Sequence, residues 1–181
     1  PIEAVSSLNL TVPMRVNCGK IDHSRIFWGD SAWAVENDWH NRSLRETQLR
    51  DRNQNINPGQ SSSRFALSST STWSTGVHEP AGIVQVEGST RRARDFSVMW
   101  QIEHNGPWEW EVGEDDPGLH ISAFGPEFQD HQWYTQLGEG NDFESVPVSF
   151  AITSGNWQQS VAEMTLQRRA LRAAKARELG R

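Results

Sequence analysis

Apolar and polar positions alternate in short runs along most of this chain, which is the pattern of half-buried β-strands. Residues 108–111 (WEWE) show it most clearly, because Trp108 and Trp110 alternate with Glu109 and Glu111 at the period that places them on opposite faces of a strand. Turn-forming runs rich in Gly, Asn and Asp separate such segments. The expected strands are residues 8–16, 32–36, 44–51, 64–70, 82–87, 95–103, 108–112, 119–124, 132–137 and 146–153.

One long helix is expected near the C-terminal end of the sequence. Residues 157–179 contain no Gly or Pro and are rich in strong helix formers, and Asn156 is a suitable N-cap. Trp157, Val161, Met164 and Leu171 fall near one face of this helix. Its second half is rich in Arg and Lys, which indicates either a solvated face or a connector that docks on a following domain.

The regular spacing of strands and turns predicts an all-β fold, an antiparallel β-sandwich (a supersandwich of two large sheets) with one C-terminal α-helix. We expect the sandwich to occupy residues 1–153 and a linker helix to occupy residues 154–181. The sequence opens directly in a strand-like run, so the sandwich is expected to be incomplete at its N-terminus. An incomplete sheet has an unpaired edge, which favours self-association into a homo-oligomer.

Composition narrows the choice of partners. The net charge of −6 and the pI of about 5.5 argue against nucleic-acid binding. Mean hydropathy is −0.68, and no apolar run approaches the roughly 20 residues that span a bilayer, so no membrane partner is expected. Cys18 is the single cysteine, which rules out an intrachain disulfide and slightly favours a cytoplasmic location.

The titratable residues predict no catalytic site, metal site or cofactor. Glu109 and Glu111 share one strand face about 6.7 Å apart, a separation that resembles a glycosidase acid/base pair. Catalytic pairs usually come from different elements of a cleft, so the preferred interpretation is the wet face of a strand. The six histidines show no metal-ligand spacing.

Tryptophan is the one residue type with a functional signal, since the chain contains nine. His104, Trp108, Trp110, His131 and Trp133 could form a surface on which sugar rings stack. Core packing competes, because strand tryptophans usually face inward. The core interpretation is preferred for Trp108 and Trp110, and both interpretations stay open for His131 and Trp133, which follow a Gly-Pro turn.

Several segments resemble, in order and spacing, the N-terminal β-sandwich domain of the family-36 α-galactosidases. Residues 102–108 (IEHNGPW) resemble the family's IE-N-G-x-W turn, and residues 131–133 (HQW) resemble a phrase that follows it. Residues 143–148 are similar to the family's closing strand, and residues 160–169 to the helix that precedes the catalytic barrel. At residues 139–141, Glu-Gly-Asn replaces the family's Pro-Gly-Glu.

The resemblance extends from about residue 82 to residue 181. It implies a parent α-galactosidase that hydrolyses terminal α-galactosides such as melibiose and raffinose by a retaining mechanism with two aspartates on a (β/α)₈ barrel. Neither aspartate has a counterpart in this chain, so the chain alone is expected to be inactive. Its expected partners are the catalytic barrel of the same parent chain and α-galactoside sugars. Contact with either is expected at His104, Trp108, His131, Gln132 and Trp133. The alternative is a free-standing carbohydrate-binding or adhesion module that uses exposed tryptophans.

Overall fold

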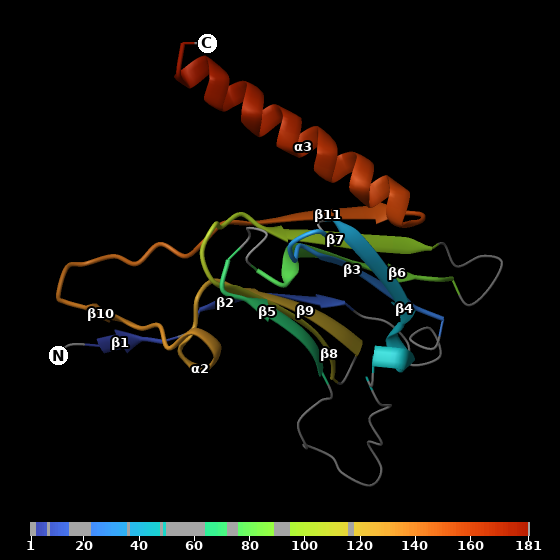
Figure 1. The fold of residues 1–181 in the computed structure, drawn as a ribbon, viewed down its shortest axis with the longest axis horizontal. Helices are drawn as coiled ribbons and strands as arrows, with labels where there is room; N and C mark the ends of the chain where they lie inside the picture. Colours follow the sequence, from blue (N-terminus) through green and yellow to red (C-terminus); the bar gives the residue numbers. More distant parts are fainter. Residues whose placement is uncertain are drawn as a thin grey trace, which may run out of the picture.

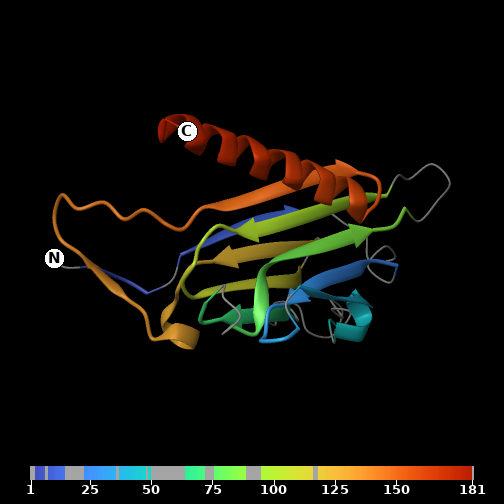
Figure 2. The ribbon, with the colours of Figure 1, turned by 45° about the horizontal axis from the view of Figure 1, so that its top comes forward.

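The protein is a sandwich of two antiparallel sheets with a long helix on its outer side (Figures 1 and 2). The computed structural model describes residues 3–6, 8–14, 23–35, 37–47, 49, 64–71, 76–88, 95–115 and 118–180. The all-β sandwich with one C-terminal helix that the sequence predicts is confirmed.

Each sheet is built from strands that are distant in sequence. The larger sheet has the order β11 (Val148–Ser154), β7 (Phe96–Ile102), β6 (His78–Val86), β3 (Arg25–Asp30) and β4 (Asp38–Ser43). The smaller sheet has the order β2 (Asn9–Met14), β9 (Gly118–Phe124), β8 (Trp108–Asp115) and β5 (Arg64–Ser69). A separate ribbon pairs β1 (Glu3–Val5) with β10 (Thr135–Leu137), and two short helical segments complete the described elements, η1 (Leu44–Thr47) and α2 (Phe128–His131).

The main core lies between the two sheets and is centred on three tryptophans. Trp100, Trp108 and Trp110 are all fully buried, and the rings of Trp100 and Trp110 meet edge to face with centroids 5.0 Å apart. Alternation explains the arrangement, since Trp108 and Trp110 occupy the inward face of β8. The preferred interpretation of Trp108 and Trp110 as core residues agrees with this burial.

A second apolar layer lies between the larger sheet and helix α3 (Trp157–Glu178). Met164 of the helix packs there with Ile83 and Met99, which point outward from β6 and β7. Both faces of β7 are therefore buried, which is why its sequence (FSVMWQI) is apolar with little alternation. The helix begins at the predicted N-cap, where Asn156 accepts from the N–H of Gln158 at 3.1 Å.

Two strand predictions were wrong. Within residues 32–36, the described residues 32–35 lie in the turn that joins β3 to β4, and the predicted strand at 44–51 begins as η1. Sequence reasoning instead missed β1, β3 and β4. The sequence of β4 is DWHNRS, without apolar alternation, because it is an exposed strand at the edge of the larger sheet.

Candidate functional site

Residues 125–147 project from one end of the sandwich (Figure 1). Exposed apolar side chains, a strained turn and a cleft lie at this end. At this end β3, β7 and β9 finish, and β6, β8 and β11 begin. The residue pairs that mark it are Asp30–His78, Ala81–Gln101, Ile102–Val148 and Glu109–Phe124. We call residues 125–147 the arm and this end of the sandwich the arm end.

Exposed apolar side chains concentrate at the arm end. Apart from Ile152, side chains of α3 and Leu179 directly after it, all the large apolar side chains exposed in the described part of the chain lie here. They are Leu8, Leu10, Trp33, Val35, Trp39, Val77, Phe128 and Tyr134. Exposed apolar side chains gathered in one region are a feature of interaction sites, whereas single ones are normal on a protein surface. The arm end is therefore the candidate contact surface of this chain.

The turn between β3 and β4 presents the most exposed of these side chains. Trp33 is 82% exposed, and the next residue, Ala34, has a left-handed backbone with φ of 69°. Such a conformation costs a non-glycine residue about 1 kcal/mol. Asn37 also has a positive φ, of 64°, and its side chain accepts from Nε1 of Trp39 at 2.8 Å. Sequence reasoning missed Trp33 because it assigned this segment to a strand.

A carboxylate between two histidines stabilises the base of this turn. Oδ2 of Asp30 lies 2.8 Å from Nε2 of His40, and Oδ1 lies 2.8 Å from Nδ1 of His78. Burial alone would raise the pKa of Asp30, but the hydrogen bonds from the two histidines outweigh it and lower the pKa. Asp30 thereby joins β3, β4 and β6 where the turn leaves the sheet.

The predicted residues His131, Gln132 and Trp133 lie in the arm, where they close the short helix α2. The N–H of Glu127 donates to Nδ1 of His131 at 3.3 Å. Gln132 is exposed, adopts a left-handed backbone (φ 53°) and donates its N–H to the carbonyl of Phe128 at 2.8 Å. The half-buried ring of Trp133 packs on Phe143, another arm residue, with centroids 5.6 Å apart.

The arm is attached to the N-terminal segment of the chain. The N–H of Phe128 donates to the carbonyl of Ser6 at 2.8 Å, and β1 pairs with β10 along its length. Phe128 and Tyr134 remain more than half exposed on this ordered backbone. The arm therefore presents aromatic side chains in a defined conformation.

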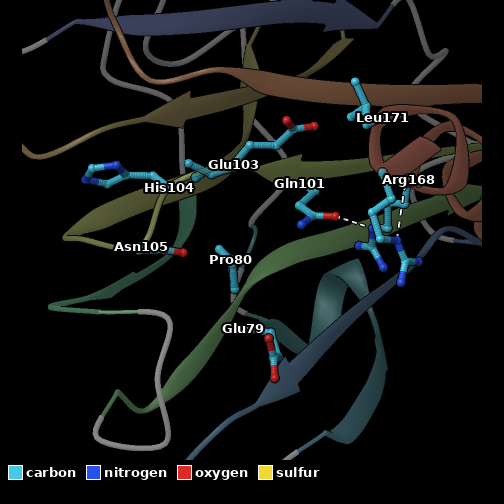
Figure 3. Close-up of a pocket in the computed structure, with 10 residues that line it drawn as sticks. Glu79, Pro80, Gln101, Glu103, His104, Asn105, Arg168 and Leu171 are labelled. Carbon is cyan, nitrogen blue, oxygen red and sulfur yellow. Dashed lines mark hydrogen bonds between the residues drawn. The ribbon is translucent and has the colours of Figure 1, made fainter. Parts of the chain in front are cut away.

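A cleft of about 500 Å³ opens at the arm end between α3 and the outer face of the larger sheet (Figure 3). Its lining includes Glu79, Gln101, His104, Arg168 and Leu171. Nε of Arg168 donates to Oε1 of Gln101 at 2.5 Å. Burial lowers the pKa of His104, and burial also raises the pKa of Glu79, an effect that the charge of Arg168 partly offsets.

The five residues predicted to make contacts therefore do not form one site. Trp108 is fully buried between the sheets, and this corrects the expectation that it offers a contact surface. His104 is half-buried in the wall of the cleft, whereas residues 131–133 belong to the arm. His104 and residues 131–133 share only their location at the arm end, and their contact role stays a prediction.

The predicted wet face of β8 is also corrected. Glu109 is only 6% exposed, and burial together with the charges of Asp130 and Glu127 raises its pKa to about 7. Glu111 lies 3.0 Å from Nη1 of Arg64 and 3.6 Å from Nε2 of His120. The hydrogen bond from His120 lowers the pKa of Glu111. The two glutamates thus occupy different environments on the same strand face.

Cys18, the one cysteine of the sequence, lies outside the described residues. Among the helices that the structure describes, none combines the length and the apolar character that a membrane span requires. No protein-family model matches this chain, and no curated protein matches it either.

Proposed function

We propose that this chain is the non-catalytic N-terminal sandwich domain of an α-galactosidase that hydrolyses terminal α-galactosides. In this proposal, the arm end contacts the catalytic barrel of the parent chain and helps to shape its substrate entrance. The motif resemblance of residues 82–181 supports the family. The proposed contact between the arm end and the barrel depends on one observation, the concentration of exposed apolar side chains at the arm end.

The geometry of the arm end suits an interface with another domain. The Trp39 indole is held by Asn37, and α2 is closed by the backbone bonds of Gln132 and Trp133, so these elements lose little freedom on binding. Large aromatic side chains held in this way are the usual anchors of protein interfaces. A partner that covers Phe128 and Tyr134 would bury apolar area that is now in water.

Helix α3 supports the same arrangement. Its first turns pack on the larger sheet through Met164, whereas Leu171 in its second half is 48% exposed beside the cleft (Figures 1 and 3). The basic residues Arg168 and Arg172 line that cleft. The second half of the helix thus has apolar and cationic groups available to a following domain.

The side chains of the described residues support an accessory role rather than catalysis. Glu111 is bound by Arg64, and Glu114 is bound by Arg45 at 2.8 Å, inside the sandwich. Asp30 is held between two histidines. A retaining glycosidase needs two carboxyl groups about 5 Å apart that flank a substrate, and ion pairing makes Asp30, Glu111 and Glu114 poor candidates for that role.

Comparison of the chain with a longer protein encoded by the same gene tests the proposal. We expect the coding sequence beyond Arg181 to open a (β/α)₈ barrel, and the longer protein to release aryl alcohol from an aryl α-galactoside. The 181-residue chain should release nothing above buffer. Turnover by the chain alone that disappears in Glu109→Gln or Glu111→Gln would contradict the accessory role.

The exposure of Trp33 favours a second candidate function, a free-standing carbohydrate-binding module. An indole that is 82% exposed on a strained turn is suited to stack against a sugar ring. This function predicts that oligosaccharides bind the isolated chain and change its tryptophan fluorescence, and that Trp33→Ala removes the response. A stop codon directly after Arg181 in the native gene would also favour it.

A further inference from the structure

Three carboxylates from two elements converge at the arm end, on the outer face of the smaller sheet. Glu109 comes from the start of β8, Glu127 precedes α2, and Asp130 lies within α2. One oxygen from each side chain lies within 4.8 Å of the others. Carboxyl groups at α2 thus lie against one on β8, and the three repel one another when ionised.

Glu109 is the member of this group that burial affects most. It is 94% buried by accessible area, since only 6% remains exposed, and its carboxyl faces the Asp130 and Glu127 side chains. The hydrogen-bond partner of its side chain is Asp130, which is itself a carboxyl group. The cation on the same face, Arg64, is bound to Glu111 at 3.0 Å instead. Two carboxyl groups can make such a buried contact only when a proton or a cation lies between them.

We propose that Glu109, Glu127 and Asp130 bind a calcium ion that joins α2 to β8. Calcium prefers carboxylate oxygens at about 2.3–2.6 Å, so two oxygens on opposite sides of one ion lie at most about 5 Å apart. The observed separations, within 4.8 Å, satisfy this limit without movement of the backbone. The three carboxylates together carry up to three negative charges. A divalent cation compensates more of this charge than a monovalent cation does.

The surroundings of the group fit calcium in particular. Asp130 is exposed and Glu127 is half-buried, so water can complete the six to eight ligands that calcium takes. The ligands come from a strand and a separate short helix, and the flexible geometry of calcium tolerates such an irregular set. Magnesium requires near-ideal octahedral geometry and should bind more weakly.

The ion would act on the arm through the N-cap of α2. Oε1 of Glu127 already accepts from the N–H of Asp130 at 2.6 Å, so the same side chain caps the helix and faces the ion. Neutralisation of the three charges removes the repulsion between α2 and β8. Calcium should therefore fix the position of Phe128 and the rest of the arm, whatever partner the arm contacts.

Calorimetric titration and thermal melting of the 181-residue chain at about pH 8, where free carboxyl groups are ionised, test the site. We expect calcium chloride to raise the melting temperature relative to EDTA, with a Kd on the order of 0.1–1 mM, because the ion has only three protein ligands. Asp130→Asn should weaken binding about tenfold or more, since affinity follows the ligand charge. Glu109→Gln should abolish binding and should raise the melting temperature in EDTA.

Glu139→Gln is the matched control, because Glu139 is an exposed arm carboxylate outside the group, and it should bind calcium like the unaltered chain. The proposal is overturned if about 10 mM calcium leaves the melting temperature of the unaltered chain unchanged. It is also overturned if Asp130→Asn responds like the unaltered chain, or if magnesium produces an equal shift. Asp130 is exposed, so this variant decides the question even if Glu109→Gln does not fold.

Discussion

The indole of Trp100 on β7 covers Gly82 on the neighbouring strand β6 so closely that a Cβ at residue 82 would lie 2.3 Å from Cζ2 of the ring. The ring cannot move away easily, because its other neighbour is Trp110 of the opposite sheet, 5.0 Å distant between centroids. Gly82→Ala should therefore lower the free energy of unfolding by about 1–3 kcal/mol through overpacking. Urea denaturation followed by tryptophan fluorescence measures this loss.

The control for this substitution is Gly138→Ala in the arm. There the nearest atom to an added Cβ is the flexible Asn141 side-chain nitrogen, at 3.2 Å. The expected change is about 0.5 kcal/mol or less. Equal stability of Gly82→Ala and the unaltered chain would show that the tryptophan core is looser than its geometry indicates.

Trp108 and Trp133 should respond differently to truncation. Trp108→Ala removes a fully buried ring and should cost about 3–5 kcal/mol of folding stability. Trp133→Ala removes a half-buried ring that packs on Phe143 of the arm, so its effect on the stability of the sandwich should be smaller. In the proposed parent α-galactosidase it should instead weaken docking or substrate binding by about 1–3 kcal/mol.

Thermal melting and kinetics on the same Trp133 variant separate these effects. In the proposed parent enzyme we expect a raised Michaelis constant and retained turnover at saturating substrate, because the proposed barrel would keep its own carboxylates. A large drop in melting temperature with an unchanged Michaelis constant would identify Trp133 as a structural residue only.

Asp30 should make stability depend on pH. Burial opposes its ionisation, but the hydrogen bonds from His40 and His78 prevail and lower its pKa in the folded state. The stabilisation is therefore fully present above the ordinary aspartate pKa of about 3.9 and is lost as pH falls through the lower folded value. Asp30→Asn should be less stable than the unaltered chain at neutral pH, and the difference should shrink in acid.

Urea denaturation at a series of pH values measures the difference. Asp142→Asn, which alters an exposed arm carboxylate, serves as the control and should follow the unaltered chain throughout. A gap between Asp30→Asn and the unaltered chain that widens in acid would mean that the two histidines do not stabilise the ionised carboxyl.

The start of α3 depends on reciprocal capping. The Asn156 side chain accepts from the N–H of Gln158 at 3.1 Å, and the Asn156 N–H donates to the Gln159 side chain at 2.9 Å. Asn156→Ala should cost about 0.5–2 kcal/mol of unfolding free energy. Gln158→Ala, at an exposed neighbouring position, should have little effect in the same denaturation experiment. A matching loss in both variants would argue against a specific cap.

Self-association is expected along β2, which forms one edge of the smaller sheet among the residues that the structure describes. Leu8 and Leu10 on or beside this strand are 46% and 49% exposed, so the edge offers both unpaired backbone groups and apolar contacts. Sedimentation should show concentration-dependent association that Leu10→Lys reduces, because a charged edge disfavours strand pairing. A compact monomer over a wide concentration range would contradict this expectation.

The sequence singled out His104, His131 and Trp133 as contact residues, and this role stays a prediction. His104 lines the cleft at the arm end, and His131 and Trp133 lie in the arm. Trp33 and the Asp30–His40–His78 group were not found, because the residues that form them are distant in sequence or lie in a turn that resembles a strand in its composition. Their proximity depends on the antiparallel register of β3, β4 and β6.

The sequence by itself determined the elements with strong local periodicity. Strands β8 and β9 follow their apolar alternation, and α3 follows its uninterrupted helix formers and its Asn156 cap, because side-chain period and capping act within a few residues. Only the tertiary structure decided what covers each face. Alternation placed Glu109 opposite the tryptophan core, but Glu127 and Asp130 of a separate segment lie against its carboxyl, and Glu109 is only 6% exposed. The residue pattern within a strand does not predict such burial, because the groups that cause it come from another part of the sequence.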